Sequence, residues 1–465
     1  MENDKNNPEK RKYDVLQQKA VVSLLKNHKT RFLFHLPAVL LFAIVVIAGF
    51  FGIQNSNKSL TTISIWVIWW SLLIISLALA GRVWCFICPF GAIGEWVQHH
   101  TLKKVDDASG FRKFPAGFRN LSIAAALFLA ITWADFQFNL VNSPLLTAYF
   151  IVALLGLIVV ISIIFERRSF CRYVCPITGL IGLYSMFAPV ELRVKEKETC
   201  KACKEKYCIS GSENGYPCPV FEYPGTMEKN THCILCMECV KTCRRDNISL
   251  NLRSFAGDFL NLTKTRMDEA LFILLLLGVT IFQTLIMIRP WAVFTQGLMI
   301  YTGAGYDTVR FVLFIASSVI PILIYSIIIA VSKLLNPKTS FKETFTGYAY
   351  SIIPLGLLMH LSHNLRHLLE EGTGIVPVLS DPFGFGWDIF GTSGYMPAPL
   401  LDNNYILLTQ WLLMFIGLGF SISIGKNISR RMSRTDMAYF PVLVFVLILF
   451  ILNLWILGQP IMHKH

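Results

Sequence analysis

Nine long apolar stretches constrain this chain more than any other feature of its sequence. Each approaches the roughly 20 residues that a helix needs to cross a hydrocarbon core of about 30 Å. The stretches are residues 32–52, 64–81, 119–138, 148–166, 269–288, 309–332, 347–368, 404–424 and 438–458. Only 15% of the residues are charged, against about 25% in an average soluble domain. The sequence therefore predicts a polytopic α-helical membrane protein with about nine transmembrane helices.

A polar, cysteine-rich segment between the fourth and fifth stretches divides the chain. We expect a cytoplasmic N-terminal tail, because residues 1–31 are basic and lack a short apolar region before a cleavage site. The predicted parts are the tail at 1–31, duplicated two-helix membrane units at 32–169, a cysteine-rich insert region at 170–268 and a five-helix C-terminal membrane domain at 269–465.

Lys and Arg residues alternate between the loops in a way that predicts the topology. The tail, the 82–119 loop, the insert and the later loops 333–346 and 425–437 are rich in positive charge. By contrast, loop 139–147 has no charged residue, and loop 369–403 has acidic residues without Lys or Arg. The positive-inside rule then predicts a multi-pass protein of a bacterial cytoplasmic (inner) membrane, with the insert in the cytoplasm and the C-terminus outside.

A short motif follows both the second and the fourth apolar stretch. Its copies read Arg82-Val-Trp-Cys85-Phe-Ile-Cys88-Pro89 and Arg168-Ser-Phe-Cys171-Arg-Tyr-Val-Cys175-Pro176. Each copy has an Arg three residues before a Cys, an aromatic residue directly before that Cys, and Cys-Pro at its end. We interpret the first four spans as a duplicated helical hairpin, each copy ending in a Cys pair at the inner surface.

The insert carries eight further cysteines with the spacing of iron–sulfur ligands. Cys233-x2-Cys236-x2-Cys239-x3-Cys243 places three thiolates on one tight loop and sends the fourth to a neighbouring cluster, as in two-cluster ferredoxins. The sequence therefore predicts a small ferredoxin-like insert with two [4Fe–4S] clusters. By ferredoxin ligation, one cluster takes Cys200, Cys203, Cys208 and Cys243, and the other takes Cys233, Cys236, Cys239 and Cys218.

The eight cysteines of the insert allow two other interpretations. Four thiolates also suit structural zinc, but three ligands so close together fit a cubane better than a tetrahedron. Disulfides disagree with the predicted reducing compartment.

The insert is also basic, with Lys201, Lys204, Lys206, Lys229, Lys241, Arg244 and Arg245. These residues either follow the positive-inside rule or form a docking face for an acidic redox partner.

The remaining cysteines, Cys85, Cys88, Cys171 and Cys175, lie in the two repeated motifs. Each second Cys precedes a Pro that suits the first position of a helix, where the helix dipole is expected to lower the thiol pKa. They are candidates for redox dithiols, for a thiolate metal site shared by the repeats, or for a contact to the insert. The plain alternative is that small apolar Cys side chains simply pack there.

Together, the two Cys-Pro motifs and the two-cluster insert resemble the membrane polyferredoxins of the NapH, NosR and CcoG type. The resemblance covers roughly Phe32 to Leu252. The family's repeated motif is C-x3-C-P, which Cys171 to Pro176 matches, whereas Cys85 to Pro89 has only two residues between its cysteines. The resemblance implies electron transfer that supports a respiratory or copper-containing enzyme, by quinol oxidation, nitrous oxide reductase maturation or copper reduction during oxidase assembly.

A second group of candidate ligands lies in the C-terminal half. His360, His363 and His367 share one face of a predicted helix, and the chain ends with Met462-His463-Lys464-His465. Methionine and imidazole ligands together suit copper. A haem or quinone site on the histidines is another interpretation, and interfacial residues bonded to neighbouring helices are the plain alternative.

We therefore expect a membrane-bound iron–sulfur protein that relays electrons between a cytoplasmic partner or the quinone pool and a respiratory enzyme. Its expected partners are the lipid bilayer and a redox protein such as a periplasmic metalloenzyme or a cytochrome, and no nucleic acid. The alternative is a maturation factor that reduces copper for a respiratory metalloenzyme. A redox sensor is the third hypothesis, although the sequence shows no output domain. Whether the chain is itself an enzyme stays open at this stage.

Overall fold

The computed structural model describes residues 13–101, 111–260, 262–335, 337–433 and 437–460. The chain forms two compact units, each assembled from separate segments. Unit 1 comprises Met1–Phe50, Ile75–Ala124 and Ala148–Thr263, and unit 2 comprises Phe51–Ile74, Ala125–Thr147 and Lys264–His465. The four parts predicted from the sequence are consecutive segments of the chain, whereas each unit combines separate segments. The predicted part boundaries therefore stay a prediction.

The described chain is mostly helical, and seven of its helices are long and apolar enough to cross a membrane. They are Thr30–Phe51, Leu60–Ala80, Pro144–Ile164, Met267–Leu285, Tyr306–Leu335, Asn403–Met432 and Met437–Leu457. Two more predicted spans also form helices. However, α7 (Ser122–Phe138) is short for a span, and α18 (Ile353–Glu371) carries several ionisable side chains. The expected count of nine is thus not confirmed, whereas a helical membrane protein is.

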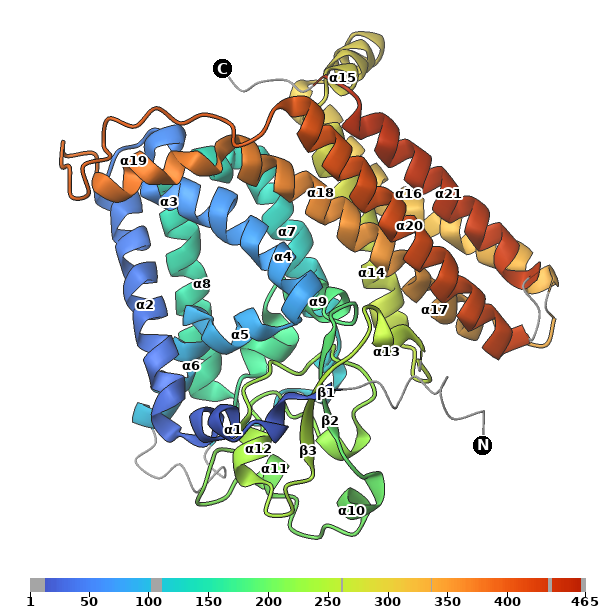
Figure 1. Cartoon of the computed structure of the whole chain (residues 1–465). Helices are drawn as coiled ribbons and strands as arrows, with labels where there is room; N and C mark the ends of the chain where they lie inside the picture. The colour runs from blue at the N-terminus through green and yellow to red at the C-terminus, as the bar shows by residue number, and fades with distance from the viewer. Residues whose placement is uncertain (1–12, 102–110, 261, 336, 434–436, 461–465) are drawn as a thin grey trace. The chain divides into compact units, whose positions relative to one another are not determined.

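Unit 1 combines long apolar helices with a small sheet (Figure 1). Most of α2 (His28–Phe51) and α8 (Pro144–Ile164) belongs to it. The repeated motifs form α5 (Val83–Ile87) followed by α6 (Pro89–Thr101), and a π-helical turn, η8 (Phe170–Val174), followed by α9 (Thr178–Tyr184). Pro89 begins α6, as predicted, because a helix's first residue needs no N–H donor.

The insert is built on a three-stranded antiparallel sheet with the order β1-β3-β2. Its strands are β1 (Tyr13–Asp14), β2 (Val190–Val194) and β3 (Ile248–Leu252). Strand β2 pairs with β3 from Val190↔Leu252 to Val194↔Ile248. Around the sheet lie the short helices α1 (Lys19–Lys26), α10 (Lys197–Lys201), α11 (Tyr207–Ser210), α12 (Glu238–Thr242) and α13 (Gly257–Leu260) (Figure 1). The apolar core is small and is centred on Leu192, Met227, Met237, Val240 and Ile248.

Unit 2 is a bundle of long helices (Figure 1). Helix α18 packs beside α20 (Asn403–Ser433), α14 (Met267–Leu285) packs beside α16 (Tyr306–Leu335), and α21 (Phe440–Leu457) contacts both α16 and α20. The remaining helices are α15 (Arg289–Thr302), α17 (Phe341–Ala349) and α19 (Ile375–Ser380).

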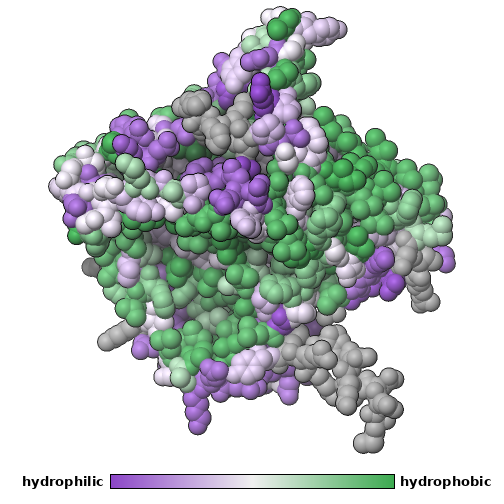
Figure 2. Space-filling view, turned by 45° about the horizontal axis from the view of Figure 1, so that its top comes forward, coloured by the Kyte–Doolittle hydropathy of each residue, from purple (hydrophilic) through white to green (hydrophobic). Residues whose placement is uncertain are grey.

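Large apolar side chains cover the outside of this bundle. Leu408, Leu412 and Phe415 of α20 are exposed, as are Ile448 and Ile451 of α21. Figure 2 shows a broad hydrophobic surface over the long helices of unit 2. Apolar patches of this extent are rare on soluble monomers, and a hydrocarbon environment would remove the cost of exposing them.

Candidate metal centres

The structure gathers four insert cysteines that are far apart in sequence. Burial, together with the neighbouring thiols of Cys243, Cys200 and Cys203, raises the pKa of Cys208 to about 11. These four residues are the first of the two predicted ligand sets. Cys200 lies in α10, Cys208 lies in α11, and Cys243 directly follows α12.

Asn247 explains how Cys243 reaches Cys200. Because β2 and β3 are antiparallel, the residues just after β2 meet those just before β3. There the side-chain amide of Asn247 donates to the Glu196 carbonyl at 2.7 Å and to Cys200 Sγ at 3.2 Å. Its backbone N–H donates to Cys243 Sγ at 3.4 Å. One buried residue therefore bonds two of the four sulfur atoms, a role that its place in the sequence did not reveal.

The second predicted ligand set is also brought together. Burial raises the pKa of Cys239, and the thiols of Cys236, Cys233 and Cys218 raise it further. Cys208 of the first set is another electrostatic neighbour of Cys239, so the two sets are adjacent. Met237 and Leu235 adopt left-handed backbone conformations, with φ of 62° and 53°. These tight turns fold the 233–239 loop around its sulfur atoms, in agreement with the C-x2-C-x2-C spacing.

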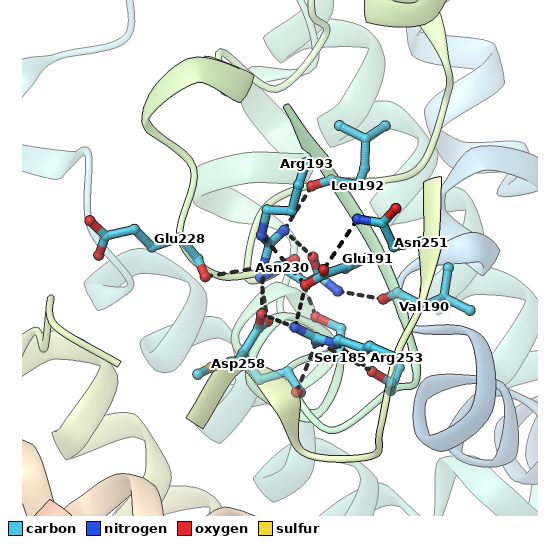
Figure 3. A network of polar contacts seen from close by, with 12 residues as sticks. Ser185, Val190, Glu191, Leu192, Arg193, Glu228, Asn230, Asn251, Arg253 and Asp258 are labelled. Carbon is cyan, nitrogen blue, oxygen red and sulfur yellow. Dashed lines mark hydrogen bonds and ion pairs between the residues drawn. The ribbon is translucent and has the colours of Figure 1, made fainter. Parts of the chain in front are cut away.

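A network of buried charges fixes the chain just before this loop (Figure 3). Asp258 accepts from the Asn230 backbone N–H at 2.7 Å and binds the guanidinium groups of Arg193 and Arg253. Asn230 in turn donates to the Val190 carbonyl at 2.7 Å. The network ties β2, α13 and the segment before Cys233 into one rigid support for the second set.

The four cysteines of the repeated motifs form a third group, which we call the Cys-Pro quartet: Cys85, Cys88, Cys171 and Cys175. Cys171 interacts electrostatically with Cys88 and Cys85, and Cys175 interacts with Cys171, Cys85 and Cys88. The sequence placed one pair at the end of each repeat and left open whether the pairs meet. In unit 1 they do.

The unequal spacing of the two pairs has a structural explanation. Cys85 lies in an α-helical turn that ends at Cys88, whereas Cys171 lies in the π-helical turn η8 that ends at Cys175. The Cys175 N–H bonds the Phe170 carbonyl at 2.8 Å, five residues earlier. A π turn holds one residue more than an α turn. The extra residue between Cys171 and Cys175 is therefore absorbed in the wider turn.

The two repeated arginines each cross from one repeat to the other. Arg82 donates to Thr178 Oγ1 at 3.2 Å and to the Thr231 carbonyl at 2.6 Å, and its Nη2 lies 3.7 Å from Cys85 Sγ. Arg168 donates to Glu95 Oε1 at 2.6 Å and to the Cys85 carbonyl at 2.7 Å. Each guanidinium thus joins the two Cys-Pro motifs.

Two glycines allow these close approaches. A Cβ on Gly91 would lie 2.6 Å from Arg168 Nη1, and a Cβ on Gly182 would lie 2.6 Å from the Thr231 carbonyl oxygen. The first neighbour is the end of a side chain, whereas the second is backbone and cannot move aside easily.

A chain of alternating buried charges runs from the second insert set to the Cys-Pro quartet. Lys241 bonds Glu238 at 2.9 Å, Glu238 lies 3.6 Å from Arg31, and Glu95 binds both Arg31 and Arg168. Glu238 lies between Cys236 and Cys239 in the sequence, and Arg168 interacts electrostatically with both Cys171 and Cys236. Burial raises the pKa of Glu95, but Arg168 and Arg31 outweigh this effect and lower it to about 2. Glu95 is therefore ionised at any physiological pH.

The thiols of the Cys-Pro quartet depart from one expectation. The N–H groups of Gly91 and Phe90 hydrogen-bond Cys88 and lower its pKa, as predicted for the start of a helix. Burial acts in the opposite direction and is the stronger effect, so the pKa of Cys88 is raised to about 11 and the pKa of Cys175 is raised as well. The predicted lowering of these pKa values is therefore wrong.

The histidines of unit 2 are only partly brought together. The His363 and His367 rings lie 5.0 Å apart, and His367 also bonds Glu371 at 3.0 Å. His360 is buried against Trp70, with the ring centroids 6.0 Å apart. Across the described ranges, no three His, Cys, Asp or Glu side chains are arranged to hold a single metal ion. Met462, His463 and His465 lie outside the described residues, so the outer metal site stays a prediction.

The donors around the insert cysteines fit iron–sulfur clusters. Each ligand set is four cysteines, the usual complement of a [4Fe–4S] cluster. Asn247 and the Glu222 N–H, which lies 3.3 Å from Cys218 Sγ, offer the N–H···S bonds that stabilise anionic sulfur. When bound, such clusters supply one-electron transfer. The chain's own residues hold the sulfur atoms and balance their charge.

Comparison with known proteins points to the same chemistry. A family described as a 4Fe-4S binding domain matches residues 63–106 and 147–194. These ranges include Cys85, Cys88, Cys171 and Cys175 and end before the first insert cysteine. The match thus supports a [4Fe–4S] cluster in this chain, and it falls on the repeated motifs rather than on the insert.

Three relatives are similar over part of the chain. An uncharacterised protein of Methanocaldococcus jannaschii is 24% identical over 177 residues, which are 37% of this chain and 65% of that protein. The putative electron transport protein YccM of Escherichia coli is 30% identical over 86 residues, 18% of this chain and 22% of YccM. The methylamine utilization ferredoxin-type protein MauN of Paracoccus denitrificans is 24% identical over 135 residues, 27% of this chain and 47% of MauN.

These similarities support a ferredoxin-type 4Fe–4S family for the chain and do not reach the particular NapH, NosR or CcoG type. The chain matches less than two thirds of the length of each relative. No solved structure matches it significantly. The similarity to proteins named for electron transport or as ferredoxin-type therefore covers only part of this chain, and these relatives do not identify its partners.

Proposed function

We propose that this protein relays electrons through two [4Fe–4S] clusters in its insert, between a cytoplasmic partner or the quinone pool and a respiratory enzyme. The observation that carries the proposal is the pairing of the eight insert cysteines. The folded chain gathers Cys208 with Cys200, Cys203 and Cys243, and gathers Cys239 with Cys218, Cys233 and Cys236. This grouping supports the crossed ligation of two-cluster ferredoxins, in which the two clusters lie close together for rapid electron exchange.

The setting of the insert supports a membrane relay rather than a free carrier. The loop after Cys218 is bound to the end of the fourth predicted span: Arg168 N–H donates to the Pro219 carbonyl at 3.0 Å, and Arg167 donates to the Cys218 carbonyl at 3.2 Å. Seven apolar helices give the chain its membrane segments. The second ligand set is therefore fixed directly to the membrane part of unit 1.

The first ligand set is the entry side in this proposal. Lys204, Lys206, Arg244 and Arg245 are exposed around it. The Arg244 guanidinium lies over the Tyr207 ring, 4.6 Å from its centroid, and stays available at the surface. Positive charge at this site favours an acidic electron-donor protein in the cytoplasm.

The test is a redox assay on the anaerobically purified protein in proteoliposomes. We expect the reduced protein to give two interacting S = ½ centres by EPR, and quinol or a reduced acidic carrier to reduce them. Cys208→Ser and Cys239→Ser should each remove one insert centre, whereas Ser210→Ala should remove none. Zinc in place of iron in the purified protein would refute the proposal. Cluster oxidation by copper ions without any quinol coupling would instead favour the maturation role.

The predicted orientation belongs to the same proposal. We infer that the insert faces the cytoplasm of a bacterial cell and that the C-terminus lies outside, on the basis of the Lys and Arg distribution. Proteolysis of spheroplasts tests this inference. An epitope tag after His465 should be cleaved from outside, and a tag in the insert should be protected. The opposite result would reverse the topology.

A further inference from the structure

We propose that the Cys-Pro quartet holds a third [4Fe–4S] cluster, with Arg82 and Arg168 as its cationic positioning residues. This inference rests on the proposed function, since it extends the relay of the insert by one centre. It also gives the two repeated motifs a common purpose. Each repeat contributes two thiols and one arginine, and neither repeat alone contains a complete ligand set.

The first observation is the convergence of the four thiols. Cys175 has Cys171, Cys85 and Cys88 as electrostatic neighbours, so the quartet is one cluster of side chains and not two separate pairs. The α turn at Cys85 and the π turn at Cys171 give both pairs a similar form despite their unequal spacing. Four thiols that converge from two helix ends form the same kind of ligand set as those of the insert.

The second observation is independent of the cysteines. In the described part of the chain, Arg82 Nε and Arg168 Nη2 are buried nitrogen atoms without a hydrogen-bond partner. The residues are only 3% and 4% exposed. A buried guanidinium N–H without an acceptor is unfavourable, so native proteins rarely leave one unmet. An acceptor is therefore expected beside both side chains, which already lie next to the thiols.

The third observation is an excess of buried positive charge. Four cationic side chains are buried in the described part of this region: Arg31, Arg82, Arg168 and Lys241. Glu95 pairs with Arg31 and Arg168, and Glu238 pairs with Lys241 and lies 3.6 Å from Arg31. Unbalanced buried charge is strongly unfavourable. Four thiolates around an iron–sulfur core form an anionic group, which supplies both the missing acceptors and the missing negative charge.

A disulfide would fit these observations less well. It would join only two of the four thiols and would be neutral, so it would leave the excess charge and the free N–H groups unmet. A structural zinc ion would also use four thiolates. However, the family match over residues 63–106 and 147–194 is to a 4Fe-4S binding domain, which favours iron.

The test counts iron in the full-length protein, purified without oxygen. We expect about twelve iron atoms per chain, four for each [4Fe–4S] cluster. Cys171→Ser should remove about four of them and leave the EPR signals of the insert unchanged. The matched variant Cys203→Ser should lose an insert signal and keep the iron of the Cys-Pro quartet. About eight iron atoms in the wild type, with no change in Cys171→Ser, would overturn the inference.

Two further measurements separate a direct effect on the cluster from a general loss of folding. Arg82→Gln keeps all four thiols, so we expect full iron content with a more negative reduction potential for one centre. A tenfold change in its oxidised-to-reduced ratio corresponds to about 59 mV for one electron. Arg82→Lys should restore part of this shift. A disulfide between any two quartet cysteines in the anaerobic protein would contradict the proposal, and absence of iron from the insert would instead remove the proposed function.

Discussion

The insert and the Cys-Pro quartet both bring thiols together in sets of four, but different contacts hold those thiols in place. In the insert, short helices and left-handed turns wrap eight cysteines within residues 200–243, and amide N–H groups contact the sulfur atoms. In the Cys-Pro quartet, the thiols stand at the ends of two helical turns, and buried ion pairs hold those turns together. The first arrangement depends on local chain geometry, and the second depends on the packing of distant helices.

This difference predicts which region needs its ligands in order to fold. The insert has a small apolar core and few long elements. Domains of that size commonly rely on a metal centre for stability. The helices that carry the Cys-Pro quartet are anchored in apolar segments and in salt bridges, so they should keep their structure when a ligand is lost.

The largest expected effect is therefore that of Cys239→Ser. It removes a ligand from the middle of the insert core, so we expect loss of the second insert centre and rapid cleavage within residues 190–252 by a protease. Cys175→Ser should leave that segment resistant. Limited proteolysis with mass spectrometry compares the two variants. Equal resistance in both would show that the insert does not depend on its ligands more than the Cys-Pro quartet does.

Glu95→Gln should have the next largest effect, and it acts on the quartet side. The change leaves Arg31 and Arg168 without their shared carboxylate, which costs about 3–5 kcal/mol when a buried pair is broken. Asp246→Asn is the control, because its partner Lys26 lies at 3.1 Å in an exposed pair worth about 1 kcal/mol or less. Thermal unfolding in detergent measures the difference.

The pH dependence of the Glu95 effect follows from its lowered pKa. A carboxyl whose pKa is lowered on folding stabilises the protein fully above its ordinary value of 4.5, and this stabilisation is lost as the pH falls toward about 2. The gap between wild type and Glu95→Gln should thus stay constant from pH 6 to pH 9. A gap that closes within this range would mean that Glu95 titrates there.

Gly182→Ala tests whether the insert and the Cys-Pro quartet are held at a fixed separation. The new Cβ would meet the Thr231 carbonyl oxygen, which also accepts from Arg82. We expect a loss of about 1–3 kcal/mol, the range for overpacking, together with a changed EPR line shape. Gly156→Ala in α8 has open space around its Cβ and should be neutral or stabilising. Equal behaviour of the two variants would show that this contact is not tight.

The smallest effect is expected for Asn247→Ala, which sharpens the account of the insert. The change removes the side-chain N–H···S bond to Cys200 and the side-chain bonds with Glu196. It keeps the backbone N–H that donates to Cys243 Sγ and leaves every thiol in place. We expect a loss of about 1 kcal/mol and a more negative potential for the first insert centre only, since hydrogen bonds to sulfur help to set cluster potentials. Asn251→Ala, in β3, is the control. Redox titration followed by EPR distinguishes them.

The membrane class and the grouping of the insert cysteines could be predicted from local signals. Apolar length and cysteine spacing are properties of short segments, and the folded chain groups Cys208 and Cys239 with the partners that ferredoxin logic assigned to them. The ligation itself remains a proposal. The count of nine spans was less secure, because α18 mixes apolar residues with His360, His363 and Arg366.

Residues that act through long-range contacts could not be found in this way. Glu95 and Arg31 are separated by 64 positions, and nothing in either local sequence marks them as a pair. Asn247 looks like an ordinary residue before a strand, yet the pairing of β2 and β3 brings it to Cys200. Even the thiol pKa values depended on burial, which the motif alone did not reveal.

The π turn at Phe170–Val174 also bears on how such chains vary. One residue can be gained or lost between the two cysteines if the turn changes between α and π form, because the hydrogen bonds adjust while the flanking helices stay in place. Insertions of a single residue should therefore be tolerated here, although they would be disruptive in most helices. A search pattern with a fixed gap would find only one of the two pairs in this chain, whereas a pattern that permits either gap would find both.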